Sequence, residues 1–238
     1  MVGDRAHRQH MTRAARSLDM LLVAENWGSP RYALTQAIDG FATNEHASDA
    51  LDYHQDVATL YALLGTGYSP TTLIGGAAGM AAVDYFIARE NALDDAKLNR
   101  FTPRFVLNQR LRRADWAPKE DFAFERIAAS AARIFRAGGN VGLGSHSELQ
   151  GLGYHWEMRA LSMGGLHPHE VLQIATRGSS SVLDRRKDMG TVAPGQYADL
   201  IIFDRNPLLD IHDSRAFGQL LRNGCLYNAD TLDRIGPC

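Results

Sequence analysis

Short apolar segments alternate with segments of helical periodicity along the first 150 residues, and this alternation limits the folds that the chain can adopt. The segments typical of strands are residues 20–25, 40–46, 66–74 and 140–144. The segments typical of helices are residues 4–17, 31–39, 52–64, 81–90 and 121–137. Strands that alternate with helices of about 10–15 residues indicate βαβ units, whose strands pair in parallel. We therefore expect an α/β fold with the carboxyl ends of its strands at one edge of a sheet.

The composition is that of a globular protein with a buried core. Of the 238 residues, 45% are hydrophobic and 22% are charged. The 25 basic and 27 acidic residues give a formal net charge of −2, which provides no basic surface for nucleic acid or for a membrane. No apolar run approaches the roughly 18 residues of a membrane-spanning helix. We expect a small-molecule substrate, with neither nucleic acid nor a membrane as partner.

Cysteine usage and the start of the chain bear on the compartment. Cys225 and Cys238 are too few for a disulfide framework, and we expect reduced thiols rather than a disulfide. The apolar stretch at residues 18–24 contains Asp19 and is about seven residues long, at the lower limit for the core of a signal peptide. We interpret it as part of a strand and expect a cytoplasmic protein.

The alternation stops at residues 91–120, a charged segment with Arg110, Arg112 and Arg113. Acidic residues balance these arginines, so we expect an insertion or lid over a site rather than a nucleic-acid contact.

The last third of the chain has a different pattern. Two helical segments, residues 155–162 and 169–177, precede a Pro-Gly turn and an apolar strand within residues 190–204. Asn223-Gly224 between two short apolar runs is a strong hairpin signal. We predict one domain over residues 1–189, with the insertion, and a small β segment over residues 190–238.

Residues 190–207 closely resemble the late segment of amidohydrolases, where the chain leaves a catalytic barrel and returns to a small β-sandwich. They read Gly-Thr-Val-Ala-Pro-Gly-Gln-Tyr-Ala-Asp-Leu and end in Asp-Arg-Asn-Pro. Residues 142–157 are similar to a subgroup of these hydrolases that is often joined to a β-propeller. Asn44-Glu45-His46 resembles the segment with the family's sixth-strand histidine, and Glu25 falls where the fifth strand would end.

This resemblance spans almost the whole chain but only the second half of the family's domain. It implies a partial (β/α) TIM-type barrel, with strands equivalent to the last four, and a small C-terminal β appendage. The family's first-strand His-x-His pair and fourth-strand lysine would lie before Met1, and Ser145-His146 stands where the eighth-strand aspartate is expected. His167-Pro168-His169 has the letters of a His-x-His pair but opens a helix, so we do not expect it to bind metal.

In a βα barrel the chemistry takes place at the carboxyl ends of the strands. Glu25, His46 and Ser145-His146 each fall at such an end, and Thr71 and Thr72 lie late in another strand. Two imidazoles and a carboxylate form a catalytic zinc set and also suit iron. We predict that Glu25, His46 and His146 bind a divalent metal, zinc first, with manganese, cobalt or iron as alternatives. A metal-activated water would then hydrolyse small amide or ester bonds.

Other roles stay open for these residues. His46 and Glu25 could be structural, Glu25 in a pair with an arginine, and His146 could hydrogen-bond the substrate. His155 and Glu157 could orient a ligand imidazole or lie on a helix surface.

Two other functions are possible. Ser145 could act as a nucleophile with His155, or less well with the adjacent His146, as base, although Gly-Ser-His-Ser lacks the Gly-x-Ser-x-Gly pattern. Alternatively, the chain could be a catalytically incomplete barrel that serves as an oligomerisation or interaction module.

Four parallel strands do not close a barrel, and the strands ending at Glu25 and Gly144 would each expose an unpaired edge. Two copies could pair, a separate chain could supply the missing half, or the chain could be a non-catalytic remnant, and symmetry favours the pairing of identical copies. We therefore predict a homodimer or a higher even oligomer, with the sheet edges at the interface.

Overall fold

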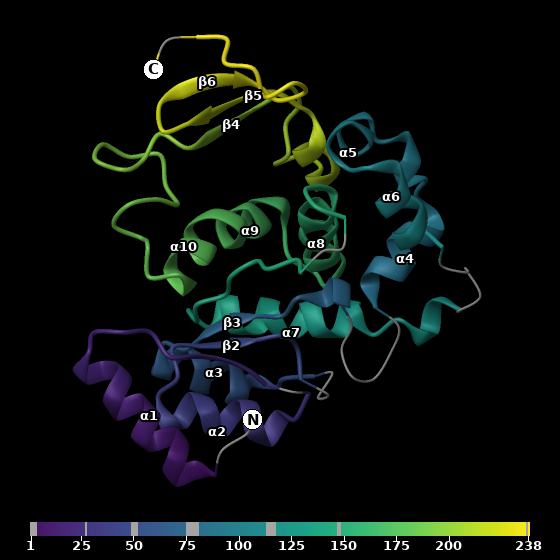
Figure 1. Cartoon of the computed structure of the whole chain (residues 1–238). Helices are drawn as coiled ribbons and strands as arrows, with labels where there is room; N and C mark the ends of the chain where they lie inside the picture. The colour runs from purple at the N-terminus through teal and green to yellow at the C-terminus, as the bar shows by residue number, and fades with distance from the viewer. Residues whose placement is uncertain are drawn as a thin grey trace.

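Two small sheets organise the chain in the computed structural model (Figure 1). The structure describes residues 4–26, 28–48, 52–74, 81–112, 118–146, 149–236 and 238. The first sheet is parallel and contains β1 (Val23–Glu25), β2 (Thr43–Glu45) and β3 (Gly67–Ser69) in chain order. The second is antiparallel and contains β4 (Leu200–Phe203), β5 (Phe217–Arg222) and β6 (Cys225–Asn228). The parallel sheet therefore precedes residue 190 and the antiparallel sheet follows it.

The expected strand at residues 140–144 is reduced to one parallel bridge between Tyr68 and Val141. Tyr68 N donates to Asn140 O at 2.9 Å, and Gly142 N donates to Tyr68 O at 3.0 Å. This segment thus continues the order β1-β2-β3 by one position. Because every neighbour is parallel, the carboxyl ends of all four segments lie at the same edge.

The helices that alternate with the strands confirm the predicted pattern. They are α1 (Arg5–Ser17), α2 (Pro30–Asp39), α3 (Gln55–Leu64) and α7 (Phe124–Arg136). Tyr61 of α3 packs against Tyr68, with 5.6 Å between the ring centroids, and donates its hydroxyl to Asn44 at 2.8 Å. One face of the sheet is therefore buried against these helices.

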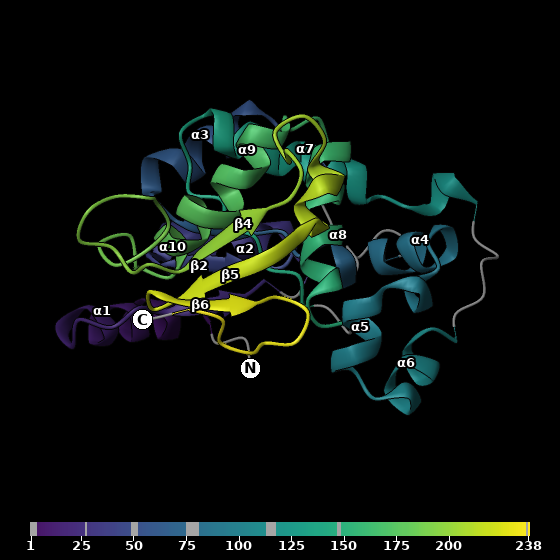
Figure 2. The ribbon, with the colours of Figure 1, turned by 90° about the horizontal axis from the view of Figure 1, so that it is seen from above.

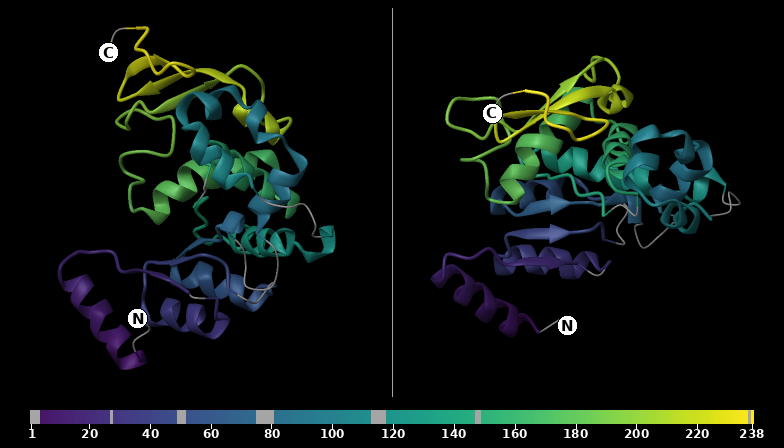
Figure 3. Two further views of the ribbon diagram at one scale, coloured as in Figure 1. Left: turned by 45° about the vertical axis from the view of Figure 1, so that its right-hand side comes forward. Right: turned by 45° about the horizontal axis from the view of Figure 1, so that its top comes forward.

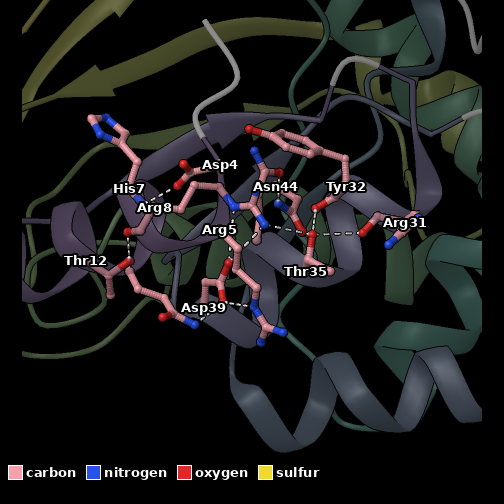
Figure 4. Close-up of polar contacts among 12 residues, drawn as sticks. Asp4, Arg5, His7, Arg8, Thr12, Arg31, Tyr32, Thr35, Asp39 and Asn44 are labelled. Atoms are coloured by element: carbon pink, nitrogen blue, oxygen red, sulfur yellow. Dashed lines mark hydrogen bonds and ion pairs between the residues drawn. The ribbon is translucent and has the colours of Figure 1, made fainter.

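The buried carboxylate of Asp39 on α2 forms hydrogen bonds with side chains of α1 (Figure 4). Asp39 accepts hydrogen bonds from Arg5 at 2.8 Å, Gln9 at 3.0 Å and Arg8 at 3.1 Å. Burial raises the pKa of Asp39, but these hydrogen bonds outweigh it and the net pKa lies below the usual value. The arginine guanidinium of Arg8 also lies 4.7 Å from the ring centroid of Tyr32. The leading helix is thus held on α2.

The other face of the parallel sheet packs against the last helices, which lie between the two sheets (Figures 1 and 3). By contrast, α1 and α2 lie beyond the parallel sheet. These elements are α8 (Leu152–Met163), α9 (Pro168–Gln173), the π-helical turn η4 (Ile174–Gly178) and α10 (Ser179–Val182).

This group closes one edge of the sheet. Ser179 Oγ accepts from Leu143 N at 3.0 Å. A Cβ added at Gly67 or Gly142 would come within 3.0 or 2.9 Å of the side chain of Val182. The expectation of an open edge beside Gly144 is therefore wrong, because the chain covers that edge itself. At β1, by contrast, Val23 is 54% exposed.

The predicted insertion forms a helical cluster to one side of the sheets (Figure 2). Its elements are η2 (Ala92–Asp94), α5 (Ala96–Phe101), α6 (Arg104–Arg110) and η3 (Lys119–Asp121), and it packs with the preceding η1 (Thr72–Ile74) and α4 (Ala82–Arg89). Its own core includes Phe86 stacked on Trp156, with 5.5 Å between ring centroids. Arg113 of the arginine-rich stretch lies outside the described residues.

The C-terminal hairpin confirms the turn prediction. Asn223 and Gly224 have φ values of 51° and 81°, as a two-residue hairpin turn of the primed type requires.

The expectation of reduced thiols is wrong, because Cys225 and Cys238 form a disulfide. The last residues run back along β6, where Arg234 forms a bridge with Tyr227 and Ile235 N donates to Leu226 O at 2.9 Å. This return brings the two sulfurs together. The cysteines therefore no longer argue for a reducing compartment.

Within the described ranges, none of the helices has both the length and the apolar character needed to span a membrane.

Candidate active site

Three of the predicted residues lie at the carboxyl edge of the parallel sheet. Glu25 ends β1, His46 follows β2 directly, and His146 follows the segment of Val141. His46 Nε2 lies 3.4 Å from Glu25 Oε1. The rings of His46 and His146 are 5.6 Å apart between centroids and nearly edge to face.

Three residues at this edge have the same kind of strained backbone conformation, a positive φ. His46, Thr71 and His146 have φ values of 69°, 51° and 40°, and each follows one of three neighbouring parallel segments. Positive φ is uncommon for residues other than glycine and especially unfavourable for a β-branched threonine. Such strain persists only where surrounding structure enforces it, and it concentrates at functional sites.

Asn26 enforces the conformation of His46, and sequence reasoning missed it. Its buried side-chain amide donates to the carbonyl of His46, while its Oδ1 accepts from Gly28 N at 2.9 Å. The backbone N of Asn26 also donates to Glu45 O at 3.3 Å. On the other side, His46 N donates to Ser69 O at 2.8 Å. The only signal in the sequence is a short polar side chain directly after an apolar strand.

One ring nitrogen of His46 has a charged partner, and the other has no partner among the described residues. Nε2 faces Glu25, whose side chain is 56% exposed, whereas Nδ1 is buried and has no hydrogen-bond partner among the described residues. A buried nitrogen without a partner costs about 1–3 kcal/mol. No hydrogen bond among the described residues therefore accounts for the position of this side of the ring.

The donor types fit a divalent metal, because two imidazoles and a carboxylate form a known zinc set. Nevertheless, in the part of the chain that the structure describes, no three His, Cys, Asp or Glu side chains are gathered closely enough to enclose an ion. Glu25 and His46 form an adjacent pair, with His146 as the nearest further imidazole. Their donor atoms are sufficient for only part of a coordination shell.

Glu157 holds the turn after β3. Its buried carboxylate accepts from Thr72 N at 2.8 Å, Thr72 Oγ1 at 2.9 Å and Leu73 N at 3.1 Å. Burial raises the pKa of Glu157 to about 7, although the three hydrogen bonds act in the opposite direction. Its bonds orient the backbone beside Thr71 rather than a histidine ring.

His155 faces the C-terminal part of the chain. Its Nδ1 lies 3.0 Å from Ser214 Oγ, and its ring is 6.0 Å from that of Phe217. Burial lowers the pKa of His155 to about 4. Ser145 precedes His146 after the Val141 segment. His155, which the sequence suggests as the base for Ser145, is instead paired with Ser214.

The chain belongs to the amidohydrolase family, whose model matches residues 9–228. Three solved structures show the shared fold. An amidohydrolase has a TM-score of 0.65 at 20% identity, over 95% of this chain and 49% of its own. A Xaa-Pro dipeptidase with methionine bound in its active site has a TM-score of 0.65 at 18% identity, over 94% and 48%. The ochratoxinase of A. niger has a TM-score of 0.66 at 19% identity, over 95% and 46%.

The chain thus spans about half the length of these proteins. A search of curated proteins found no match.

Proposed function

We propose that the chain carries the carboxyl-terminal half of an amidohydrolase (β/α) barrel and acts in the hydrolysis of small amide bonds. The observation that carries this proposal is the Glu25–His46 pair, at 3.4 Å, with His146 beside it, at the carboxyl ends of β1, β2 and the Val141 segment. The family match and the order of the segments support the half barrel.

Glu25 and His46 would hold the metal, with His146 as the nearest further donor. A bound divalent ion would polarise the substrate carbonyl and lower the pKa of a water molecule. The Glu25 carboxylate lies 3.4 Å from His46 Nε2, so the two side chains present donor atoms to the same side of the site. As the alternative to binding the ion, the exposed imidazole of His146 would hydrogen-bond the substrate. Glu157 keeps Thr71 at the same edge through its bonds to Thr72 and Leu73.

Dipeptides are the first substrates to test, because one similar structure is a Xaa-Pro dipeptidase. The panel should contain Xaa-Pro and other dipeptides, aminoacyl anilides and nitrophenyl esters, assayed with zinc, manganese or cobalt. Hydrolysis that a chelator and His46→Ala abolish supports the proposal. His54→Ala is the matched control, since His54 is exposed at the start of α3 and makes no capping hydrogen bond there. Hydrolysis that survives both changes but is lost in Ser145→Ala would replace it with a serine mechanism.

The expected self-association would use only the β1 edge of the parallel sheet. Leu21 and Val23 are about half exposed at β1, whereas the edge at Val141 is covered by Ser179 and its neighbours. Two copies that share an eight-stranded barrel would need both edges. Twofold pairing through β1 is therefore the form of the homodimer that we propose.

A further inference from the structure

A pocket of about 250 Å³ lies at the amino end of the Val141 segment, between the turn after α7 and the group of α9, η4 and α10. That group lies between the two sheets (Figure 1). Because all the neighbouring segments are parallel and His146 follows the carboxyl end of the same segment, this pocket and the candidate active site lie at opposite edges of the parallel sheet. The pocket shares no lining residue with the site at Glu25 and His46.

The charged side chains of this pocket are all positive. Arg177 and Arg186 line it, and its described lining contains neither aspartate nor glutamate. Among the described residues, neither guanidinium group forms an ion pair or a side-chain hydrogen bond. The acids nearest to Arg186 in sequence do not balance it, because Asp188 pairs with Arg185 at 2.7 Å and Asp184 is exposed outside the lining. Two positive charges therefore lack a counter-charge in the described part of the chain.

The backbone holds Arg177 at the pocket wall. Arg177 belongs to the π-helical turn η4, and single π-helical turns of this kind occur frequently at functional sites. A Cβ added to the next residue, Gly178, would clash with the carbonyl oxygen of Val141. Only glycine therefore lets η4 approach the Val141 segment so closely. The Arg177 carbonyl also accepts from Ser180 Oγ at 2.8 Å.

A different segment fixes the backbone of Arg186. Its carbonyl oxygen accepts a hydrogen bond from Gln196 Nε2 at 3.0 Å, and Gln196 Oε1 accepts in turn from Thr191 N at 3.0 Å. Arg177 and Arg186 are both exposed. The chain thus anchors the backbone of the two arginines and leaves their guanidinium groups accessible to a ligand.

Neutral groups complete the lining. The side-chain amide of Gln173 has no hydrogen-bond partner among the described residues, whereas Asn140 donates to Gly65 O at 3.0 Å and accepts from Ser181 at 3.1 Å. Phe135 provides an apolar part of the wall. At about 30 Å³ for each water-sized atom, the pocket holds roughly eight non-hydrogen atoms, which is more than a phosphate group alone contains.

We propose that this pocket binds the phosphate group of a small phosphorylated molecule. Each guanidinium presents paired N–H groups that match the spacing of phosphate oxygens. Two arginines balance the roughly two negative charges that a phosphate monoester carries near pH 7, whereas a carboxylate would balance only one. The free amide of Gln173 can donate to a further oxygen, and the organic group lies toward Phe135. The proposal stands independently of hydrolysis at the sheet edge.

The test measures the binding of phenyl phosphate, inorganic phosphate and benzoate by isothermal titration calorimetry. We expect phenyl phosphate to bind at least as tightly as inorganic phosphate and more tightly than benzoate. Arg177→Gln and Arg186→Gln should each weaken phenyl phosphate binding about tenfold or more, because each removes a charge-assisted hydrogen bond. Both positions are exposed and unpaired among the described residues, so both variants should melt as the wild type does.

Two further variants separate this pocket from other causes of binding. Arg31→Gln removes an equal charge from an exposed position on α2 outside the lining and should have no effect. His46→Ala should also bind phenyl phosphate normally, whereas phosphate bound to a metal at the sheet edge would be lost in that variant. No binding of phenyl phosphate, binding of inorganic phosphate alone, equal loss in Arg31→Gln, or binding that survives both Arg177→Gln and Arg186→Gln would overturn the proposal.

Discussion

The side-chain amide of Asn26 donates a hydrogen bond to the backbone carbonyl of His46. This bond joins the residue after β1 to the residue after β2, and it holds His46 at a φ of 69°. The imidazole next to Glu25 is therefore oriented by a neighbouring strand as well as by its own.

Asn26→Ala should destabilise the protein by about 1–3 kcal/mol, because it leaves the His46 carbonyl and the Gly28 amide without their partner. It should also weaken zinc binding by about tenfold or more, as loss of a group that orients a ligand does. Urea unfolding and zinc titration measure the two effects. Asn26→Asp separates them, since it keeps an acceptor for Gly28 but has no donor for His46. Unchanged zinc affinity in both variants would show that Asn26 does not position the ring.

Glu157 predicts a specific dependence of stability on pH. Its pKa is about 7 in the folded protein, above the ordinary value of 4.5, so the folded state holds the proton more tightly than the unfolded chain does. This contribution to stability is fully present below about pH 4.5 and is lost as the pH rises through about 7. Between pH 6.5 and 8.5 we expect a loss of about 1 kcal/mol in the free energy of unfolding.

Glu157→Gln should show no such loss over this range, even if it is less stable at every pH. His155 acts in the opposite direction, because its pKa of about 4 in the folded protein lies below its ordinary value of 6.5, but its contribution is common to both proteins and cancels in the comparison. Equal slopes for the two proteins in urea unfolding would contradict the assignment.

The disulfide predicts no free thiol in the protein purified without reductant. Mass spectrometry should show a mass two hydrogens lower than that of the reduced chain, and Cys238→Ser should leave Cys225 reactive. Loss of the bridge across 13 positions should cost up to about 3 kcal/mol through the entropy of the unfolded chain. Two reactive thiols in the native protein would refute the pairing.

Pairing through β1 predicts a dimer in light scattering at low micromolar concentration. Val23→Lys places a charge on the half-exposed edge strand and should give monomers. Leu63→Lys, at an equally apolar and more exposed position on α3, should leave the dimer intact. A wild-type monomer with cooperative melting would mean that the chain also closes the β1 edge without a second copy.

Local sequence patterns predicted the alternating elements, the Asn223-Gly224 hairpin and the common edge of Glu25, His46 and His146, because each depends on periodicity or turn chemistry. They could not predict long-range pairings. Val182 over Gly67 and Gly142, Ser214 against His155, and Cys238 beside Cys225 all join segments that meet only after folding. The division into two domains at residue 189 stays a prediction.

The central claim is a metal site at the carboxyl edge of the parallel sheet, and the zinc content of the chain tests it directly. Zinc, or cobalt as a spectroscopic substitute, is measured in the wild type, in His46→Ala and in the control His54→Ala. We expect about one ion per chain in the wild type and the control, as a single site of two imidazoles and a carboxylate would hold. His46→Ala should lose most of it. Less than about a tenth of an equivalent in the wild type after incubation with metal, or equal binding in His46→Ala, would contradict a metal site at this edge.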